Sequence, residues 1–213
     1  MTRRLVRALA ALALLALPAA AAPPPDPWQA LSEVRAQFAG SGPRVADFEQ
    51  VYIPAGFAQG EKETGRLALS LPDCLRWDYG APYPKSFLVC GNLAHYWSEQ
   101  DGVGKRQRIV GREEPGLDLL LLGVAELSKR YRARAEPLPL GQVRIHLVPL
   151  QPLSSITEAT LTLDHAAGVV SGLEYRDREG NLTRFVISRY SPLPGTELFT
   201  PPATVAWEDV EEP

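Results

Sequence analysis

Cysteine, histidine and methionine are scarce in this chain of 213 residues, which contains two, three and one of them, respectively. His95, His146 and His165 lie far apart in the sequence, and none has a cysteine nearby to complete a metal-ligand set. No serine lies in a nucleophile elbow, and no Ser-His-Asp set is indicated. These absences argue against an enzyme and against a bound metal or other cofactor.

An excess of basic residues is also missing, because 22 Lys and Arg residues are set against 25 Asp and Glu residues. The resulting net charge of −3 argues against binding to nucleic acid or to anionic membrane surfaces. Long apolar runs are missing as well, since no segment reaches the ~18 apolar residues that a membrane-spanning helix requires. We therefore expect a soluble protein that buries one sizeable core.

The N-terminus has the pattern of a secretory signal peptide. Three arginines within residues 1–7 precede a short apolar run over residues 8–17, and small residues follow. We expect cleavage after Ala21, which would leave residues 22–213 as a single domain with 19 basic and 25 acidic residues and a net charge near −6. No cysteine lies near this site for lipid attachment, so we expect the chain to be exported without an anchor.

Alternating apolar and polar residues dominate the chain from residue 44 on. In GRLALSLPDCLRWDY, residues 65–79, leucines at every second position point to one side of an extended chain, and Leu75, Trp77 and Tyr79 continue that side. About eleven such runs predict a mainly β protein, a meander of antiparallel strands that curls into an open or closed barrel. The runs cover residues 44–53, 63–71, 74–79, 86–90, 94–98, 105–110, 131–138, 142–149, 156–164, 168–177 and 181–190.

Two segments have helical periodicity instead. The stretch DPWQALSEVRAQFAG predicts a helix over residues 27–39 that begins after Asp26 and ends at Gly40, with its apolar residues on one face. The stretch EEPGLDLLLLGVAELSKRY, residues 113–131, predicts two short helices separated at Gly123. Leucine covers more of their circumference than a surface helix with one packed side requires.

The two cysteines, Cys74 and Cys90, flank a turn candidate, GAPYP, centred near Pro82. In a hairpin with that centre they lie roughly opposite each other, and an exported protein meets an oxidising compartment. We therefore predict a disulfide between Cys74 and Cys90. The alternative is a pair of reduced, buried cysteines that pack as small apolar residues.

Several motifs follow one another in a specific order. A signal peptide and an amphipathic helix precede FEQ at residues 48–50 and GRLALSLPDCLRWDYGAPYPKSFLVCGN at residues 65–92. The Leu-rich helices then precede LVPL, LEYRDREGNLTRF and LFTPP. This order resembles that of the LolA family, the periplasmic carriers that move lipoproteins to the outer membrane, and it covers nearly all of the mature chain.

The resemblance implies an incomplete β-barrel, which is an open and strongly curved antiparallel sheet around a hydrophobic cavity that short helices cover. The helices at residues 27–39 and 115–129 would be those covering elements. The side chains expected to line the lipid-binding cavity are Phe48, Leu67, Leu69, Leu71, Leu75, Trp77, Phe87, Val89, Ile145, Leu147, Phe185 and Ile187. Those expected to form a lid are Leu117, Leu119, Leu120, Leu121, Leu122 and Val124.

The resemblance also implies a function that requires no covalent chemistry. Exposing each methylene of an acyl chain to water costs ~0.8 kcal/mol, so an acylated lipoprotein has to be shielded to cross the periplasm. The expected partners are acylated lipoproteins, an inner-membrane lipoprotein-releasing transporter and an outer-membrane receptor, with the carrier as a monomer. A carrier of another lipid or glycolipid, or a lipid-sensing regulatory domain, is the alternative.

One position departs from the family pattern. The residue before the proline of LSLPDCLRW is typically an arginine whose hydrogen bonds to the lid help to hold the cavity shut, and here it is Leu71. The latch is therefore missing or relocated, with Lys129 and Arg130 at the helix end as possible replacements. A weakly latched lid would leave an open groove or fit a different cargo.

Overall fold

The computed structural model describes residues 24–98, 100–109, 117–151 and 155–210. The predicted signal peptide and the start of the predicted helical segment at residue 113 lie outside these residues. Within them, every predicted run is a strand whose bounds differ from the prediction by two residues or fewer. The strands are β1 (Arg44–Ile53), β2 (Glu61–Ser70), β3 (Cys74–Tyr79), β4 (Lys85–Cys90), β5 (Leu93–Trp97), β6 (Val103–Arg108), β7 (Tyr131–Pro137), β8 (Gln142–Pro149), β9 (Ile156–Asp164), β10 (Val169–Asp177), β11 (Leu182–Pro192) and β12 (Ala206–Asp209).

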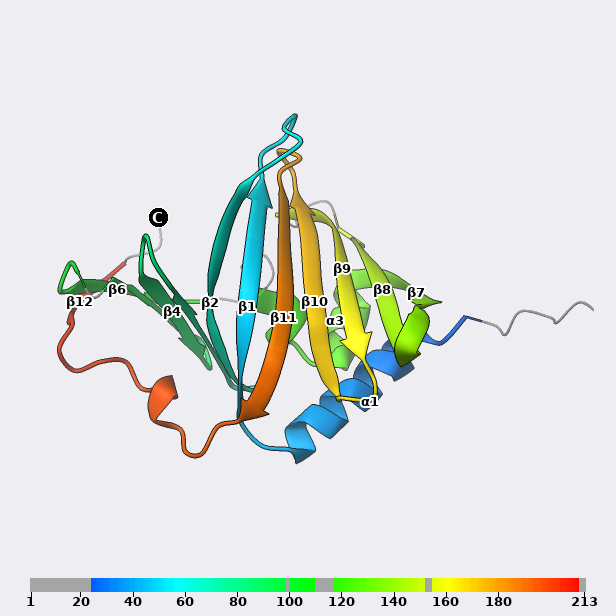
Figure 1. Ribbon diagram of the computed structural model, residues 1–213, viewed down its shortest axis with the longest axis horizontal. Coiled ribbons are helices and arrows are strands. Elements are labelled where there is room, and N and C mark those ends of the chain that lie inside the picture. The colour runs from blue at the N-terminus through cyan, green and yellow to red at the C-terminus, as the bar shows by residue number, and fades with distance from the viewer. Residues whose placement is uncertain (1–23, 99, 110–116, 152–154, 211–213) are drawn as a thin grey trace, which may run out of the picture.

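All of these strands form one curved sheet (Figure 1), in the order β12-β6-β5-β4-β3-β2-β1-β11-β10-β9-β8-β7. The sheet consists of two antiparallel meanders, β1 to β6 and β7 to β11, that are joined where β1 pairs with β11. The two edge strands, β7 and β12, do not pair with each other, so the sheet is open. The predicted fold class, an open and mainly β sheet with short helices, is confirmed.

Strand β12 was not predicted from the sequence. It pairs in parallel with β6, with Trp207 beside Gly104 and Asp209 beside Arg106. Gly104 accommodates this pairing because a Cβ atom there would lie 2.5 Å from the Trp207 ring. Arg106 donates two hydrogen bonds to the Asp209 carboxylate, at 2.7 and 2.9 Å.

The curvature of the sheet has local causes. Opposite Val45 and Asp47 an extra residue between Ser188 and Ser191 bends β11, and further register shifts interrupt the pairing of β9 with β10, because a bulge increases the local twist of a strand. At Gly65 in β2 a Cβ atom would lie 2.1 Å from the carbonyl oxygen of Asp78 and 2.8 Å from the Phe48 ring. Only glycine therefore permits this close approach of β2 to its neighbours.

Helix α1 (Pro27–Gly40) forms as predicted. The Asp26 side chain accepts a 2.7 Å hydrogen bond from the backbone N–H of Gln29, and Pro27 occupies the first turn. The predicted pair of short helices is present as α2 (Leu117–Leu121) and α3 (Val124–Arg130), with Gly123 between them. No helix among the described residues is long and apolar enough to cross a membrane.

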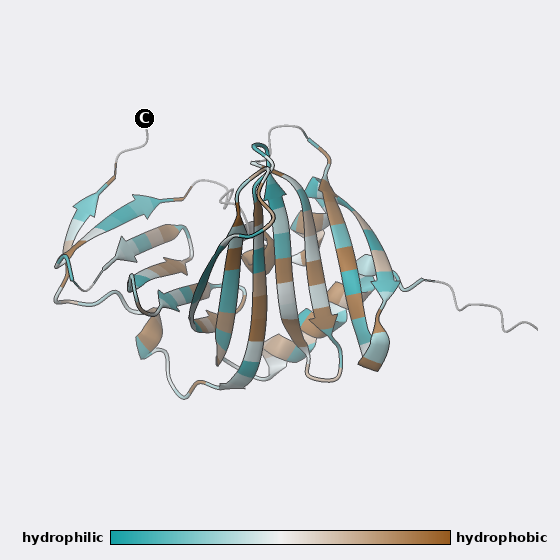
Figure 2. Cartoon of the chain, turned by 45° about the horizontal axis from the view of Figure 1, so that its top comes forward, coloured by the Kyte–Doolittle hydropathy of each residue, from teal (hydrophilic) through white to brown (hydrophobic). Residues whose placement is uncertain are grey.

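The helices cover one face of the sheet, which we call the inner face. Figure 2 shows apolar and polar residues alternating along the strands, as expected when one face is buried. The main core lies between the inner face and the helices, and its fully buried members include Leu31 of α1 and Leu127 of α3. A second, smaller cluster lies on the outer face, where Leu88 and Trp97 pack against Val205 and Trp207.

Cys74 and Cys90 are directly opposite each other on β3 and β4, with their Cα atoms 4.2 Å apart, and they form a disulfide. Cys90 packs against the small outer-face cluster. The disulfide therefore joins the two strands at the end where β3 begins and β4 ends.

Candidate functional site

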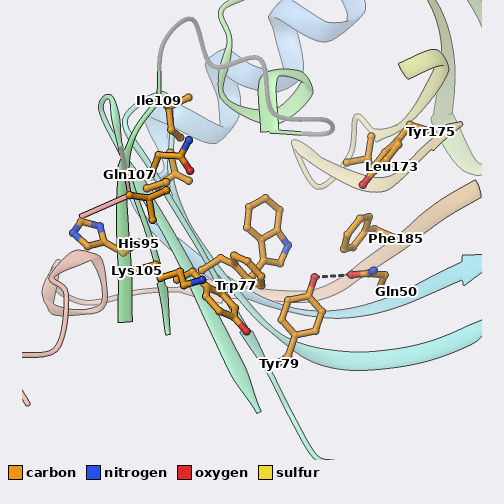
Figure 3. A pocket seen from close by; sticks show the side chains of 15 residues that line it. Gln50, Trp77, Tyr79, His95, Lys105, Gln107, Ile109, Leu173, Tyr175 and Phe185 are labelled. Atoms are coloured by element: carbon orange, nitrogen blue, oxygen red, sulfur yellow. Dashed lines mark hydrogen bonds between the residues drawn. The ribbon is translucent and has the colours of Figure 1, made fainter. Parts of the chain in front are cut away.

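A pocket of about 450 Å³ opens on the inner face of the sheet, over strands β3 to β6 (Figure 3). Strands β10 and β11 supply its opposite wall through Leu173, Tyr175 and Phe185. This volume lies in the lower part of the range of ~300–1,000 Å³ that is typical of small-molecule sites. The pocket is therefore large enough for one slender ligand in this conformation of the protein.

Six of the fifteen residues that line the pocket are Phe, Tyr or Trp. Register and alternation place Trp77 of β3 opposite Phe87 of β4, and Phe87 opposite Tyr96 of β5, so the three rings lie side by side on the inner face. The ring centroids of Phe87 and Tyr96 are 4.8 Å apart, and those of Trp77 and Phe185 are 6.4 Å apart. The result is a continuous apolar wall with few polar groups to fix a ligand in one orientation.

Tyr79 is a polar group in this wall whose hydrogen bond is already made. Its hydroxyl donates to Oε1 of Gln50 at 2.5 Å. Burial of the phenol, followed by the nearby carboxylate of Glu63 and by Tyr175, raises the pKa of Tyr79 above its ordinary value of 10. The phenol therefore stays neutral at physiological pH, and its burial leaves no charge in the wall.

The structure separates the predicted cavity residues into two sets. Four of them line the pocket, namely Trp77, Phe87, Val89 and Phe185. Seven others are buried in the main core, namely Phe48, Leu67, Leu69, Leu75, Ile145, Leu147 and Ile187. Leu71 belongs to neither set, since it is only partly buried and lines a separate small cavity beside Leu120 and Arg35.

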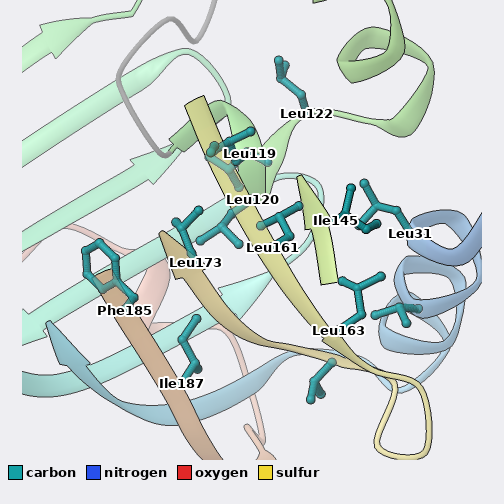
Figure 4. Close-up of a cluster of buried hydrophobic side chains, with 14 of the residues drawn as sticks. Leu31, Leu119, Leu120, Leu122, Ile145, Leu161, Leu163, Leu173, Phe185 and Ile187 are labelled. Atoms are coloured by element: carbon teal, nitrogen blue, oxygen red, sulfur yellow. The ribbon is translucent and has the colours of Figure 1, made fainter. Parts of the chain in front are cut away.

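The predicted lid residues fill the space between the inner face and α1. Leu119, Leu120, Leu121 and Leu122 are all buried in the main core, and Val124 packs against it (Figure 4). Leu161 and Leu173 of the sheet lie beneath these leucines in the same view. The side chain of Leu117 is outside the described residues. The short helices thus occupy the part of the inner face that the pocket leaves free.

An arginine on α1 holds the leucine-rich segment in place. Nη2 of Arg35 donates to the carbonyl oxygen of Leu119 at 2.8 Å, and Nη1 donates to the carbonyl oxygen of Leu122. These carbonyls lie at the end of α2, where a helix has no intrahelical donors for its acceptors. Burial lowers the pKa of Arg35 to about 10, so the guanidinium remains charged at neutral pH.

Sequence reasoning did not identify Arg35, because it looked for an arginine at the position of Leu71. The two side chains line the same small cavity, so an arginine does reach this region from a different element. One of the two possible replacements named from the sequence is engaged elsewhere, since the ammonium of Lys129 pairs with Glu126 at 2.7 Å within α3.

Several pocket residues were also missed. Tyr79 follows from the same alternation as Trp77, and Tyr96 lies opposite Phe87, so the pattern could have found both. Polar residues such as Lys105 could not be found by a search for apolar faces. The pocket residues not predicted are Gln50, Tyr79, Ala94, His95, Tyr96, Lys105, Gln107, Ile109, Leu173, Tyr175 and Val210.

The described residues contain no group of three or more His, Cys, Asp and Glu side chains that could hold a metal ion. The site combines an apolar pocket wall with an inner face that the helices cover only in part. The leucine-rich segment at α2 is bound to α1 through the hydrogen bonds of Arg35. The fold and the pocket together define a class: a binding protein whose curved sheet and short helices enclose an apolar site.

Comparison with known proteins identifies the family within that class. The family model described as "Outer membrane lipoprotein carrier protein LolA" matches residues 44–200. The chain therefore belongs to the LolA family, as the order of its motifs indicated.

Named relatives support this assignment at low identity. The chain is 26% identical over 167 residues to an outer-membrane lipoprotein carrier protein of Dechloromonas aromatica, covering 74% of this chain and 77% of the relative. It is 27% identical over 171 residues to the protein of the same name in Chromobacterium violaceum, with 78% of each chain covered. An uncharacterized conserved protein of Thermus thermophilus has a similar fold, with a TM-score of 0.54 at 11% identity over 85% of this chain and 98% of its own.

Proposed function

We propose that the protein is a periplasmic carrier that shields the acyl chains of lipoproteins between the inner and the outer membrane. The observation that carries the proposal is an aromatic-lined pocket that lies next to a leucine-rich segment on the same face of the sheet. Membership of the LolA family supports the lipoprotein as cargo. We also propose that residues 22–213 form the mature domain after removal of residues 1–21.

The pocket volume indicates how such a carrier would work. About 450 Å³ is sufficient for one slender ligand but small for the several chains of a fully acylated lipoprotein. Helices α2 and α3 would therefore have to move off the inner face as the cargo enters, which would expose Leu119, Leu120 and Leu121 to the acyl chains. Apolar surface that packs on itself in the empty protein would then pack on the ligand, so burial is preserved in both states.

Release and delivery then depend on differences in affinity. A binding protein can shift an equilibrium only by as much as its partners differ in affinity, so direction has to come from the donor and the acceptor. The proposed donor is an inner-membrane lipoprotein-releasing transporter, and the proposed acceptor is an outer-membrane receptor. The protein itself would act by binding alone.

The test is to purify the protein from the periplasm of its native host and to identify bound species by mass spectrometry. We expect triacylated lipoproteins with the wild-type protein and much less with Phe87→Asp, which places a charge in the pocket wall. The matched control is Phe57→Asp, because Phe57 is 69% exposed and lies between β1 and β2, away from the pocket. Another lipid in the bound fraction would favour the alternative cargo, and no lipid at all would contradict the proposal.

A further inference from the structure

The pocket has a charge pattern that the apolar wall does not explain. Among its described lining residues, Lys105 is the one with a formal charge at neutral pH, and no carboxylate lines the pocket. This positive charge occurs in a chain whose net charge is −3. A site adapted only to hydrocarbon would not need an ammonium group at its edge.

Lys105 lies on the pocket side of β6. It is directly opposite Tyr96, and Tyr96 belongs to the aromatic wall through its contact with Phe87. Figure 3 shows Lys105 on the β6 side of the pocket together with Gln107, across from Leu173 and Phe185. A ligand whose chain lies along Trp77 and Phe185 would thus bring its end near Lys105 and Gln107.

Two other cations, on β4 and β6, have carboxylate partners of their own. The Lys85 ammonium lies 2.7 Å from Glu63, and Arg106 is bound to Asp209. Glu208 of β12 lies beside Lys105 in the strand register, yet the two form no ion pair. Within the described part of the chain Lys105 therefore has no anionic partner of its own.

We propose that the pocket selects an amphiphile with an anionic headgroup, which Lys105 binds while the aliphatic chain lies along the aromatic wall. Resting on the proposed carrier function, this inference adds an anionic group beside the acyl chains of the cargo, which the ester- and amide-linked chains of a lipoprotein do not themselves supply. Lys105 is exposed at the edge of the pocket, so a neutral ligand gains nothing from its ammonium group. An anionic headgroup accepts a charge-assisted hydrogen bond from it, to which Gln107 can add a donor.

The experiment compares two ligands with the same chain, laurate and the neutral 1-lauroylglycerol, by titration calorimetry with the mature protein. We expect laurate to bind more tightly, and Lys105→Gln to weaken laurate roughly tenfold while leaving 1-lauroylglycerol nearly unchanged. Lys105→Glu should weaken laurate further. The matched control is Lys62→Gln, since Lys62 is exposed and pairs with Glu49 outside the pocket.

The outcomes separate this inference from the proposed function. Equal affinity of the wild-type protein for both ligands, or an equal loss of both in Lys105→Gln, would overturn the role of Lys105 and leave the carrier function standing. Failure of the wild-type protein to bind either ligand would contradict both proposals. Thermal unfolding of each variant shows whether a loss of affinity reflects a loss of fold.

Discussion

On strands β7 to β9 the inner face is filled, whereas on β3 to β6, across from β10 and β11, it is partly empty. In the filled half, Ile145, Leu147 and Leu161 are fully buried beneath the helices. In the emptier half, the rings of Trp77 and Phe87 border a pocket of about 450 Å³. Aliphatic side chains interdigitate with the helical leucines, while large flat rings cover strand surface without filling the space above it.

The two halves of the inner face therefore contribute to different properties of the protein. The filled half stabilises the empty protein, and the pocket half offers the first contact to a ligand. The boundary between them is formed by α2 and α3, which Arg35 holds from α1. A substitution in the filled half should therefore lower mainly the free energy of unfolding, and a substitution in the pocket half should lower mainly the affinity for ligand.

Leu161→Ala should have the largest effect on stability. Leu161 is fully buried in the filled half, and truncating such a leucine costs about 2–5 kcal/mol because a cavity remains. Urea unfolding of the variant should show this loss in the free energy of unfolding, with laurate affinity retained by the folded fraction. Phe87→Ala is the matched change in the pocket half, and it should lose more affinity than stability. The same ratio of effects in both variants would contradict the division of tasks.

Replacing Cys74 and Cys90 together by alanine should destabilise the pocket half. The disulfide closes a loop with a sequence separation of 16, and a loop of that size corresponds to about 3 kcal/mol in the chain-entropy description. Hydrogen exchange should quicken in β3 and β4 far more than in β8 and β9. A uniform increase over the whole sheet would show that the two halves unfold as one unit.

Arg35→Met should loosen the boundary between the halves. It removes the donors to the carbonyls of Leu119 and Leu122, and leaving a buried acceptor unsatisfied costs about 1–3 kcal/mol. We expect faster hydrogen exchange over residues 117–130 and faster ligand entry in stopped-flow measurements. Arg44→Met is a control, because Arg44 lies over the Phe38 ring, whereas Arg35 is the donor to Leu119 and Leu122. Unchanged exchange in Arg35→Met would exclude a latch at this position.

The smallest expected effect is a pH dependence at the outer face. Burial of the imidazole, followed by the positive charge of Arg106, lowers the pKa of His95 below its ordinary value of 6.5. The unfolded chain then binds more protons than the folded one in this range, so stability falls as the pH is lowered below 6.5. Because the His95 ring contacts Trp207, urea unfolding followed by tryptophan fluorescence at pH 7.5 and 5.5 should detect the change. His95→Phe should reduce it, and an unaltered pH dependence in that variant would assign it elsewhere.

The sequence predicted the strands well because alternation is a local property. It placed Cys74 opposite Cys90 and the leucines of β2 on one face, and both positions hold in the structure. It could not predict β12, since a four-residue strand that pairs in parallel with a segment about 100 residues away leaves no local pattern. A short strand with a distant partner can therefore be located only once the whole sheet is known.

The candidate site was less predictable than the fold for a related reason. Alternation shows that Leu69 and Trp77 share a face, but it does not show that helices fill the space above one and leave space above the other. Arg35 and Lys105 are polar, so a search for apolar faces passes over them. The role of Arg35 depends on the carbonyl groups of Leu119 and Leu122, and that of Lys105 on its place opposite Tyr96. Both depend on the tertiary structure, which local patterns do not show.

The pairing of β1 with β11 has a consequence for the order of folding. Residues 44–53 pair with residues 182–192, and this contact joins the two meanders. Each meander can form from neighbouring strands, whereas the central seam must wait until residue 192 has been synthesised. Non-local pairing of this kind slows folding and prolongs the exposure of apolar surface. A chain truncated before residue 182 would therefore present two unjoined sheets rather than a smaller version of the same protein.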